Sequence, residues 1–175
     1  MLKKVGIIGT ILPVFFILTA CNSTVAPRRH EPVLEFSAKI CIATGEQFVE
    51  GILKSSNNSG LEFCVTSPEQ INGLVLKKIN SENAVSFKGL EMKTNENKLP
   101  DSSFFLVLGE VLESLGDNNN YNFISTENTI STLSGKCKTS GNYEVQIYDS
   151  SGYIKEIKVP SKNLVISFSE FKENG

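Results

Sequence analysis

The chain has 175 residues, of which 40% are hydrophobic, and carries 17 Lys and Arg against 19 Asp and Glu. A slightly acidic chain with no basic cluster is a poor partner for nucleic acid, so we exclude that class of function. The length after residue 20 is sufficient for one domain with its own hydrophobic core.

The first twenty residues are typical of an export signal. Two lysines precede an uncharged run over 5–20, which is shorter than the roughly 20 residues of a membrane-spanning helix and is interrupted by Pro13. The run ends in Leu18-Thr19-Ala20-Cys21, which resembles the lipobox of bacterial lipoproteins. This resemblance implies that residues 1–20 are removed and that the Cys21 thiol is acylated. The protein would then be lipid-anchored at the cell membrane, facing outside the cytoplasm. An ordinary signal peptide followed by a chance cysteine is the alternative.

The next segment, 21–35, holds the lipidated cysteine and two prolines without apolar periodicity, which predicts a flexible tether. From Phe36 onward the hydrophobic period becomes two, which is typical of half-buried strands. We therefore expect a single domain over 36–171 and a short tail over 172–175.

Most of this domain is predicted to be β-structure. The expected strands, nine or ten in all, cover 36–42, 47–54, 61–66, 74–79, 84–87 continued by 90–92, 121–125, 129–138, 142–148, 153–159 and 163–171.

Two helical segments interrupt the strands. Ser67-Pro68-Glu69-Gln70 has the pattern of a capping box, with Ser67 as N-cap, and predicts one helical turn. The second predicted helix covers 102–115, is capped by Asp101 or Ser102, and ends before Gly116. Its apolar residues recur at helical spacing: Phe104, Phe105, Leu108, Val111, Leu112 and Leu115. The predicted fold class is α+β, a curved antiparallel sheet (a half-barrel) with one long helix on its concave face.

Three cysteines remain in the domain: Cys41, Cys64 and Cys137. If the strands pair in sequence order, those of Cys41 and Cys64 flank a third strand and lie about 9–10 Å apart. A disulfide needs Cα atoms within about 7 Å, so free thiols are favoured.

The sequence gives little support for a catalytic site or a metal site. The single histidine, His30, falls in the tether, and the cysteines are too far apart in sequence to form a zinc motif. Glu110 and Glu113 are expected to be a solvated helix face. We predict no enzyme activity, no metal and no cofactor.

The order of strands and turns resembles the lipoprotein-carrier superfamily of LolA- and LolB-like proteins and mycobacterial lipid-binding lipoproteins. A closer resemblance is to uncharacterised small lipoproteins of Gram-positive anaerobes. The segments that carry it are 36–40, 50–53, 67–74, 152, 157–160 and 164–171. The superfamily fold is an incomplete antiparallel barrel closed by helices, with a cavity for acyl chains. Several helices line that cavity, whereas this chain predicts one, which counts against a large cavity.

The resemblance and the strand pattern together predict an apolar face for a lipid or other apolar ligand. Its residues are Phe36, Ile40, Ile42, Phe63, Val65, Phe104, Leu108, Leu112, Val145, Ile147, Ile166 and Phe168. The same residues would form a packed core, and the pattern does not distinguish the two. A ligand-free module that binds another envelope protein through a sheet face or edge strand is the competing function.

Overall fold

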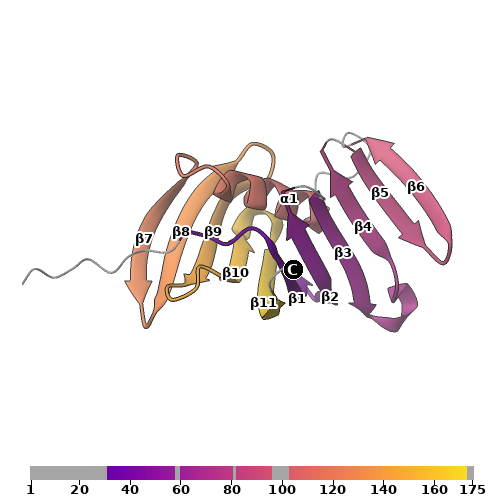
Figure 1. Ribbon diagram of the computed structural model, residues 1–175, viewed down its shortest axis with the longest axis horizontal. Coiled ribbons are helices and arrows are strands. Elements are labelled where there is room, and N and C mark those ends of the chain that lie inside the picture. Colours follow the sequence, from indigo (N-terminus) through magenta and orange to yellow (C-terminus); the bar gives the residue numbers. More distant parts are fainter. Residues whose placement is uncertain (1–30, 58–59, 81, 96–102, 173–175) are drawn as a thin grey trace, which may run out of the picture.

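The computed structural model describes residues 31–57, 60–80, 82–95 and 103–172, and shows a bent sheet crossed by one helix (Figure 1). These residues form eleven strands, one α-helix and two short 3-10 helices. In chain order they are β1 (Phe36–Thr44), β2 (Gln47–Ser56), β3 (Gly60–Ser67), η1 (Glu69–Ile71), β4 (Val75–Ile79), β5 (Glu82–Phe87), β6 (Leu90–Asn95), α1 (Phe104–Leu115), β7 (Tyr121–Glu127), β8 (Ile130–Cys137), β9 (Gly141–Tyr148), β10 (Ile154–Val159), η3 (Pro160–Lys162) and β11 (Leu164–Lys172).

All eleven strands belong to one open sheet in the order β6-β5-β4-β3-β2-β1-β11-β10-β9-β8-β7. Every neighbouring pair is antiparallel, so the sheet consists of two meanders joined where β1 pairs with β11. The chain passes from one edge of the sheet, β6, to the other, β7, by way of α1. The helix therefore crosses one face of the sheet, which we call the inner face.

Alternation along each strand places the core on this inner face. In β1, for example, Phe36, Ala38, Ile40 and Ile42 are buried and the residues between them are partly exposed. The buried side of α1 closes this core with residues Phe105, Val107, Leu108, Gly109, Val111, Leu112 and Leu115. The predicted α+β class, with a curved antiparallel sheet and one helix, is confirmed.

The strand count was predicted too low. Residues 90–92 were treated as a continuation of the preceding strand, whereas Leu90 begins a separate strand, β6, that pairs with β5. A two-residue turn separates them, and both Lys88 (φ 48°) and Gly89 (φ 82°) are in the left-handed region. This conformation suits a tight hairpin, but a lysine in its first position is a weak turn signal.

Both predicted helix starts need correction. The cap residue of α1 is Ser103, and Asp101 and Ser102 lie outside the described residues. The predicted helical turn begins at Glu69, and its cap residue is Pro68 rather than Ser67. Pro68 has extended backbone and no side-chain acceptor, so the expected capping box does not form.

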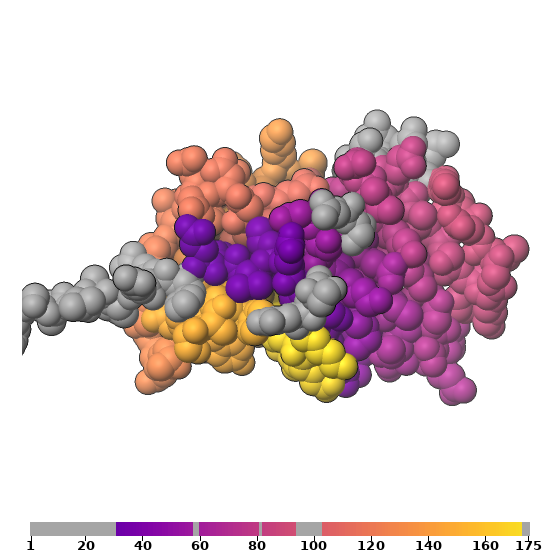
Figure 2. Space-filling model, in the orientation of Figure 1, coloured from indigo at the N-terminus to yellow at the C-terminus, as the bar shows by residue number. Residues whose placement is uncertain are grey.

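Part of the predicted tether packs on the domain. The backbone N–H of Val33 donates to the carbonyl of Gly152 at 3.0 Å, and Leu34 packs against the core. A Cβ at position 152 would lie 2.3 Å from the carbonyl oxygen of Glu31, so this close approach requires glycine. Figure 2 shows the described N-terminal residues (indigo) beside the C-terminal strands (orange and yellow). The chain thus enters the domain beside β9 and β10, on the other side of β1 from β4–β6.

The expected placement of two cysteines is confirmed, since β1 and β3, which carry Cys41 and Cys64, flank β2. Cys41, Cys64 and Cys137 are all free thiols.

Candidate functional site: an uncovered apolar face on β4–β6

The twelve apolar residues predicted from the sequence come together in one cluster between the sheet and α1. Eleven of them are buried, and Phe104 is partly buried against the same cluster. The ring of Phe63 meets that of Phe104 edge-on at 5.7 Å, and that of Phe36 meets Phe168 at 5.9 Å. These side chains therefore pack against one another, and their role as a ligand face stays a prediction.

The inner face extends beyond the helix, over β4, β5 and β6. Directly opposed residues of an antiparallel sheet point to the same face. Phe63 on β3 opposes Leu76, Leu76 opposes Val85, and Val85 opposes Met92. Because side chains alternate along a strand, Phe87 and its partner Leu90 share this face. We call Leu76, Val85, Phe87, Leu90 and Met92 the wing face.

Burial decreases steadily along this row of residues. Phe63 is fully buried and Leu76 partly buried against the core, whereas Met92 is 59% exposed and Leu90 79% exposed. α1 reaches the inner face at β3, where Phe104 touches Phe63, and does not bury these last side chains. The part of the chain that the structure describes thus leaves a contiguous apolar surface open to solvent. Contiguous exposed apolar surface commonly marks a binding site.

The outer face of the sheet carries charged side chains on β1–β4. Glu62 forms ion pairs there with Lys77 at 2.8 Å and Lys54 at 3.9 Å, and Lys39 pairs with Glu50 at 3.4 Å. The hydrogen bond and the charge of Glu62 raise the pKa of Lys77 above its ordinary value. The outer face thus carries ion pairs across β1–β4, together with exposed apolar residues such as Ile52 and Ile79.

The wing face ends in polar residues at the opposite end of the strands from the β5–β6 turn. Leu61 opposes Lys78, and Lys78 opposes Asn83, so all three lie on the inner face. Lys78 is only 8% exposed, and its ammonium donates to Oε1 of Glu113 on α1 at 2.7 Å. Its Cδ would lie 3.4 Å from a Cβ at position 109, so glycine in the helix leaves room for the lysine chain.

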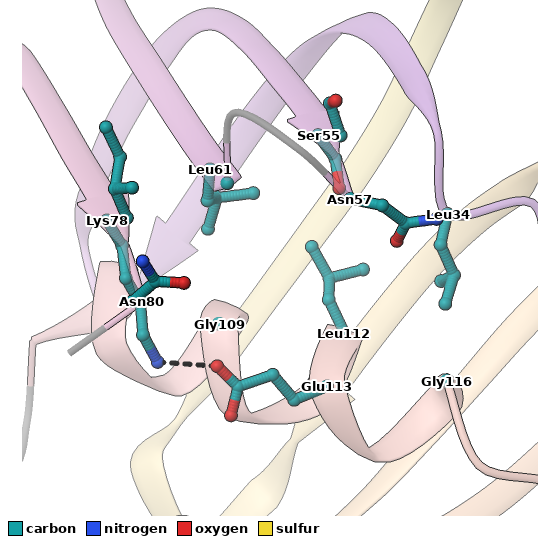
Figure 3. Close-up of a pocket in the computed structure, with 13 residues that line it drawn as sticks. Leu34, Ser55, Asn57, Leu61, Lys78, Asn80, Gly109, Leu112, Glu113 and Gly116 are labelled. Atoms are coloured by element: carbon teal, nitrogen blue, oxygen red, sulfur yellow. Dashed lines mark hydrogen bonds and ion pairs between the residues drawn. The ribbon is translucent and has the colours of Figure 1, made fainter.

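Beside this lysine is a cavity of about 300 Å³ at the seam between the sheet and α1 (Figure 3). Leu34, Leu61 and Leu112 surround it, and Lys78 reaches across to Glu113 (Figure 3). Backbone and side chains of the β2–β3 turn region, including Ser55 and Asn57, supply polar groups. We call it the seam cavity. Its volume is at the lower end of the range for small-molecule sites, roughly 300–1,000 Å³.

The sequence matches no protein-family model and no curated protein. Among solved structures, the chain is similar to a LolA superfamily protein from Nitrosomonas europaea. The identity is 10%, the TM-score 0.42, and the alignment covers 85% of this chain and 89% of that one. It is also similar to a DUF1329 family protein from Desulfovibrio piger, with 12% identity, a TM-score of 0.39, and 79% and 84% of the two chains covered. Because the identities are this low, what this chain binds has to be inferred from its own residues.

The carboxylate of Glu110 has a structural role that the sequence did not indicate. It accepts hydrogen bonds from the backbone N–H of Ser140 at 3.1 Å, from the Ser140 hydroxyl at 2.6 Å, and from the Thr139 hydroxyl. Burial raises the pKa of Glu110, but the hydrogen bonds from Ser140 and Thr139 outweigh it and hold the pKa below its ordinary value. The prediction of a solvated face is wrong for Glu110, which is partly buried, whereas the Glu113 side chain is 66% exposed, as predicted. Both side chains also bond to residues outside the helix and so fasten α1 to the rest of the domain.

Among the described residues, no three His, Cys, Asp or Glu side chains are grouped as a metal site would require. The helix α1 is too short to span a bilayer, and it is the one α-helix in the described part of the chain.

The wing face was not predicted from the sequence. An apolar alternation is visible in the sequence at Val85, Phe87, Leu90 and Met92. Which of these side chains are exposed depends on how far α1 extends across the sheet. The polar residues Lys78 and Asn83 carried no signal, because lysine and asparagine are expected on the outside of a strand.

Proposed function

We propose that this protein is an exported lipoprotein, anchored through acylated Cys21, whose domain binds one acyl chain of a lipid on the wing face. The observation that carries the binding proposal is the exposure of Leu90 and Met92 on a face that is otherwise continuous with the hydrophobic core. An acyl chain lying there would extend the core outward by covering these side chains, each worth about 1.5–3 kcal/mol when fully buried.

The shape of the surface favours a lipid as its occupant. From Phe87 to Asn83 the inner face of β5 runs about 13 Å, at roughly 3.3 Å per residue, and changes from apolar to polar along that length. A lipid has the same division between an apolar chain and a polar head. The seam cavity lies next to the polar end, since Lys78 lines it.

The location supports the same proposal. The uncharged run over 5–20 and the sequence Leu18-Thr19-Ala20-Cys21 predict an anchor in the bilayer. A domain held beside a membrane meets lipids at high local concentration, because tethering makes the encounter effectively intramolecular.

The competing function is an interaction module for another envelope protein. It is favoured by a specific observation: within the described residues, β6 and β7 each pair with a single strand, so both edges could accept an added strand. Such a partner would bind through backbone hydrogen bonds and would leave lipid binding absent.

Two measurements test the proposal. Radiolabelled palmitate should enter the full-length protein in cells and be lost in Cys21→Ala, while the matched variant Cys41→Ala keeps the label. Equal labelling of the wild type and Cys21→Ala would contradict the anchor.

Native mass spectrometry of the detergent-extracted protein from its host membrane tests the second part. We expect a species whose mass exceeds that of the acylated chain by one lipid. If the acylated chain is recovered without added mass, and takes up no fatty-acid probe, the interaction module becomes the better explanation.

A further inference from the structure

At the polar end of the wing face, one buried side chain, that of Asn83, lacks hydrogen-bond partners within the described residues. Asn83 is 1% exposed, and in the described part of the chain neither its Nδ2 nor its Oδ1 has a hydrogen-bond partner. Buried amides are nearly always hydrogen-bonded, because the bonds to water are lost on burial. Two unmet atoms on one carboxamide therefore indicate a group that belongs there and comes from outside the described chain.

The surroundings of Asn83 place this group next to the proposed acyl chain. Asn83 precedes Val85 by two residues on the same face of β5, and it opposes Lys78 on β4. Lys78 lines the seam cavity and spans from the sheet to Glu113 on the helix (Figure 3). Asn83 is not itself among the described residues that line the cavity, but Lys78, its direct neighbour across the β4–β5 pair, is.

The charges around Asn83 select against an ionised head. The ammonium of Lys78 already has the carboxylate of Glu113 at 2.7 Å, so the pair is neutral as a unit. A carboxylate head would approach the negative charge of Glu113, and, having only acceptor atoms, would leave Oδ1 of Asn83 unmet. A head with both an acceptor and a donor satisfies both atoms of the carboxamide.

We propose that Asn83 recognises the head of the bound lipid, and that this head is uncharged and carries a carbonyl next to an N–H or O–H. Fatty acid amides and monoacylglycerols have this chemistry. In this arrangement Nδ2 of Asn83 donates to the lipid carbonyl, and the lipid N–H or O–H donates to Oδ1. The inference rests on the proposed function, since it assigns the head of the lipid whose chain lies on the wing face.

The test compares ligands with the same number of carbon atoms on the full-length protein by native mass spectrometry. Oleamide, oleate and 1-octadecene are each added at equal concentration, at a pH where oleate is ionised. We expect the bound fraction to be largest for oleamide, exceeding oleate by about fivefold, as the one net hydrogen bond to Oδ1 that oleate cannot make would give. Oleate bound as well as oleamide by the wild type overturns the inference without any variant.

A substitution then assigns the preference to the residue. Asn83→Leu should bring oleamide and 1-octadecene to similar binding, and Asn83→Ala provides a second variant, with the fold of each checked by circular dichroism. The matched control, Asn142→Leu, alters an exposed asparagine on β9 and should keep the preference. A preference that survives both changes at position 83 also overturns the inference. Absence of binding for all three ligands instead contradicts the proposed function.

Discussion

Replacing the two most exposed side chains of the wing face should separate ligand binding from folding. The double variant Leu90→Asn/Met92→Asn removes apolar side chains that are 79% and 59% exposed. Complete burial of a Leu or Met side chain is worth about 1.5–3 kcal/mol, so covering these exposed fractions would contribute about 2–4 kcal/mol. A bound chain that covers half of this surface contributes about 1–2 kcal/mol, which corresponds to a loss of about tenfold in affinity in the variant.

The folded state should be little affected, because the same side chains contribute little to the core. Exposed substitutions in strands usually change the free energy of unfolding by less than about 1 kcal/mol. The matched control is Phe48→Asn/Ile52→Asn, which changes exposed apolar residues (63% and 37%) elsewhere in the sheet, on β2.

The assay is a titration of the full-length protein with a fluorescent fatty-acid probe, alongside urea unfolding of each variant. We expect about tenfold weaker binding for the Leu90/Met92 pair and unchanged binding for the Phe48/Ile52 pair. If the Leu90/Met92 variant binds the probe as tightly as the wild type does, the assignment of the acyl chain to the wing face is refuted. Equal loss in both would mean that the probe adsorbs to any exposed apolar residue.

Three further predictions concern the domain itself. Leu108→Ala, at a fully buried helix position, should lower the free energy of unfolding by about 2–5 kcal/mol in urea titrations; a loss below 1 kcal/mol would contradict the packed core. Since the folded pKa of Glu110 is lowered, its contribution to stability is present above the ordinary value of 4.5 and is lost as the pH falls below it. Glu110→Gln should therefore be less stable than the wild type at neutral pH, and its stability should fall less steeply in acid; parallel pH profiles would contradict this role. Burial, with the charges of nearby acidic residues, raises the pKa of the Cys137 thiol to about 11. In the folded protein at neutral pH, iodoacetamide should therefore modify Cys137 more slowly than the partly exposed Cys41 and Cys64, and rapid modification of Cys137 should require unfolding. Equal labelling rates, mapped by mass spectrometry, would show that α1 does not shield Cys137.

Much of the fold could be predicted because its patterns are local. Alternation in β1 and the helical spacing of Leu108, Val111 and Leu112 each identify one element and its buried face. The turn at Lys88-Gly89 was missed because its conformation comes from two positive φ angles, and lysine gives no indication of the first. The start of α1 was placed too early because Ser102 and Ser103 are chemically the same cap candidate.

The candidate site could not be predicted, for a different physical reason. The twelve apolar residues chosen from the sequence are those with the strongest periodicity, and strong periodicity selects positions that other elements cover. The wing face is exposed because α1 does not extend over it. Met92 continues the row of Phe63, Leu76 and Val85 but stays exposed to solvent. Asn83 is buried by the same long-range arrangement. Whether a strand residue is buried by a distant helix depends on tertiary contacts, which a single sequence pattern does not specify.

Photo-crosslinking locates a bound acyl chain, and so shows whether it lies on the inner face of β4–β6. A fatty acid amide with a diazirine near the end of its chain is irradiated with the full-length protein, and the modified peptides are mapped by mass spectrometry. We predict modification within β5 and β6, residues 82–95, with excess oleamide suppressing it. Modification concentrated on β2, or labelling that excess oleamide does not reduce, would contradict binding on the wing face.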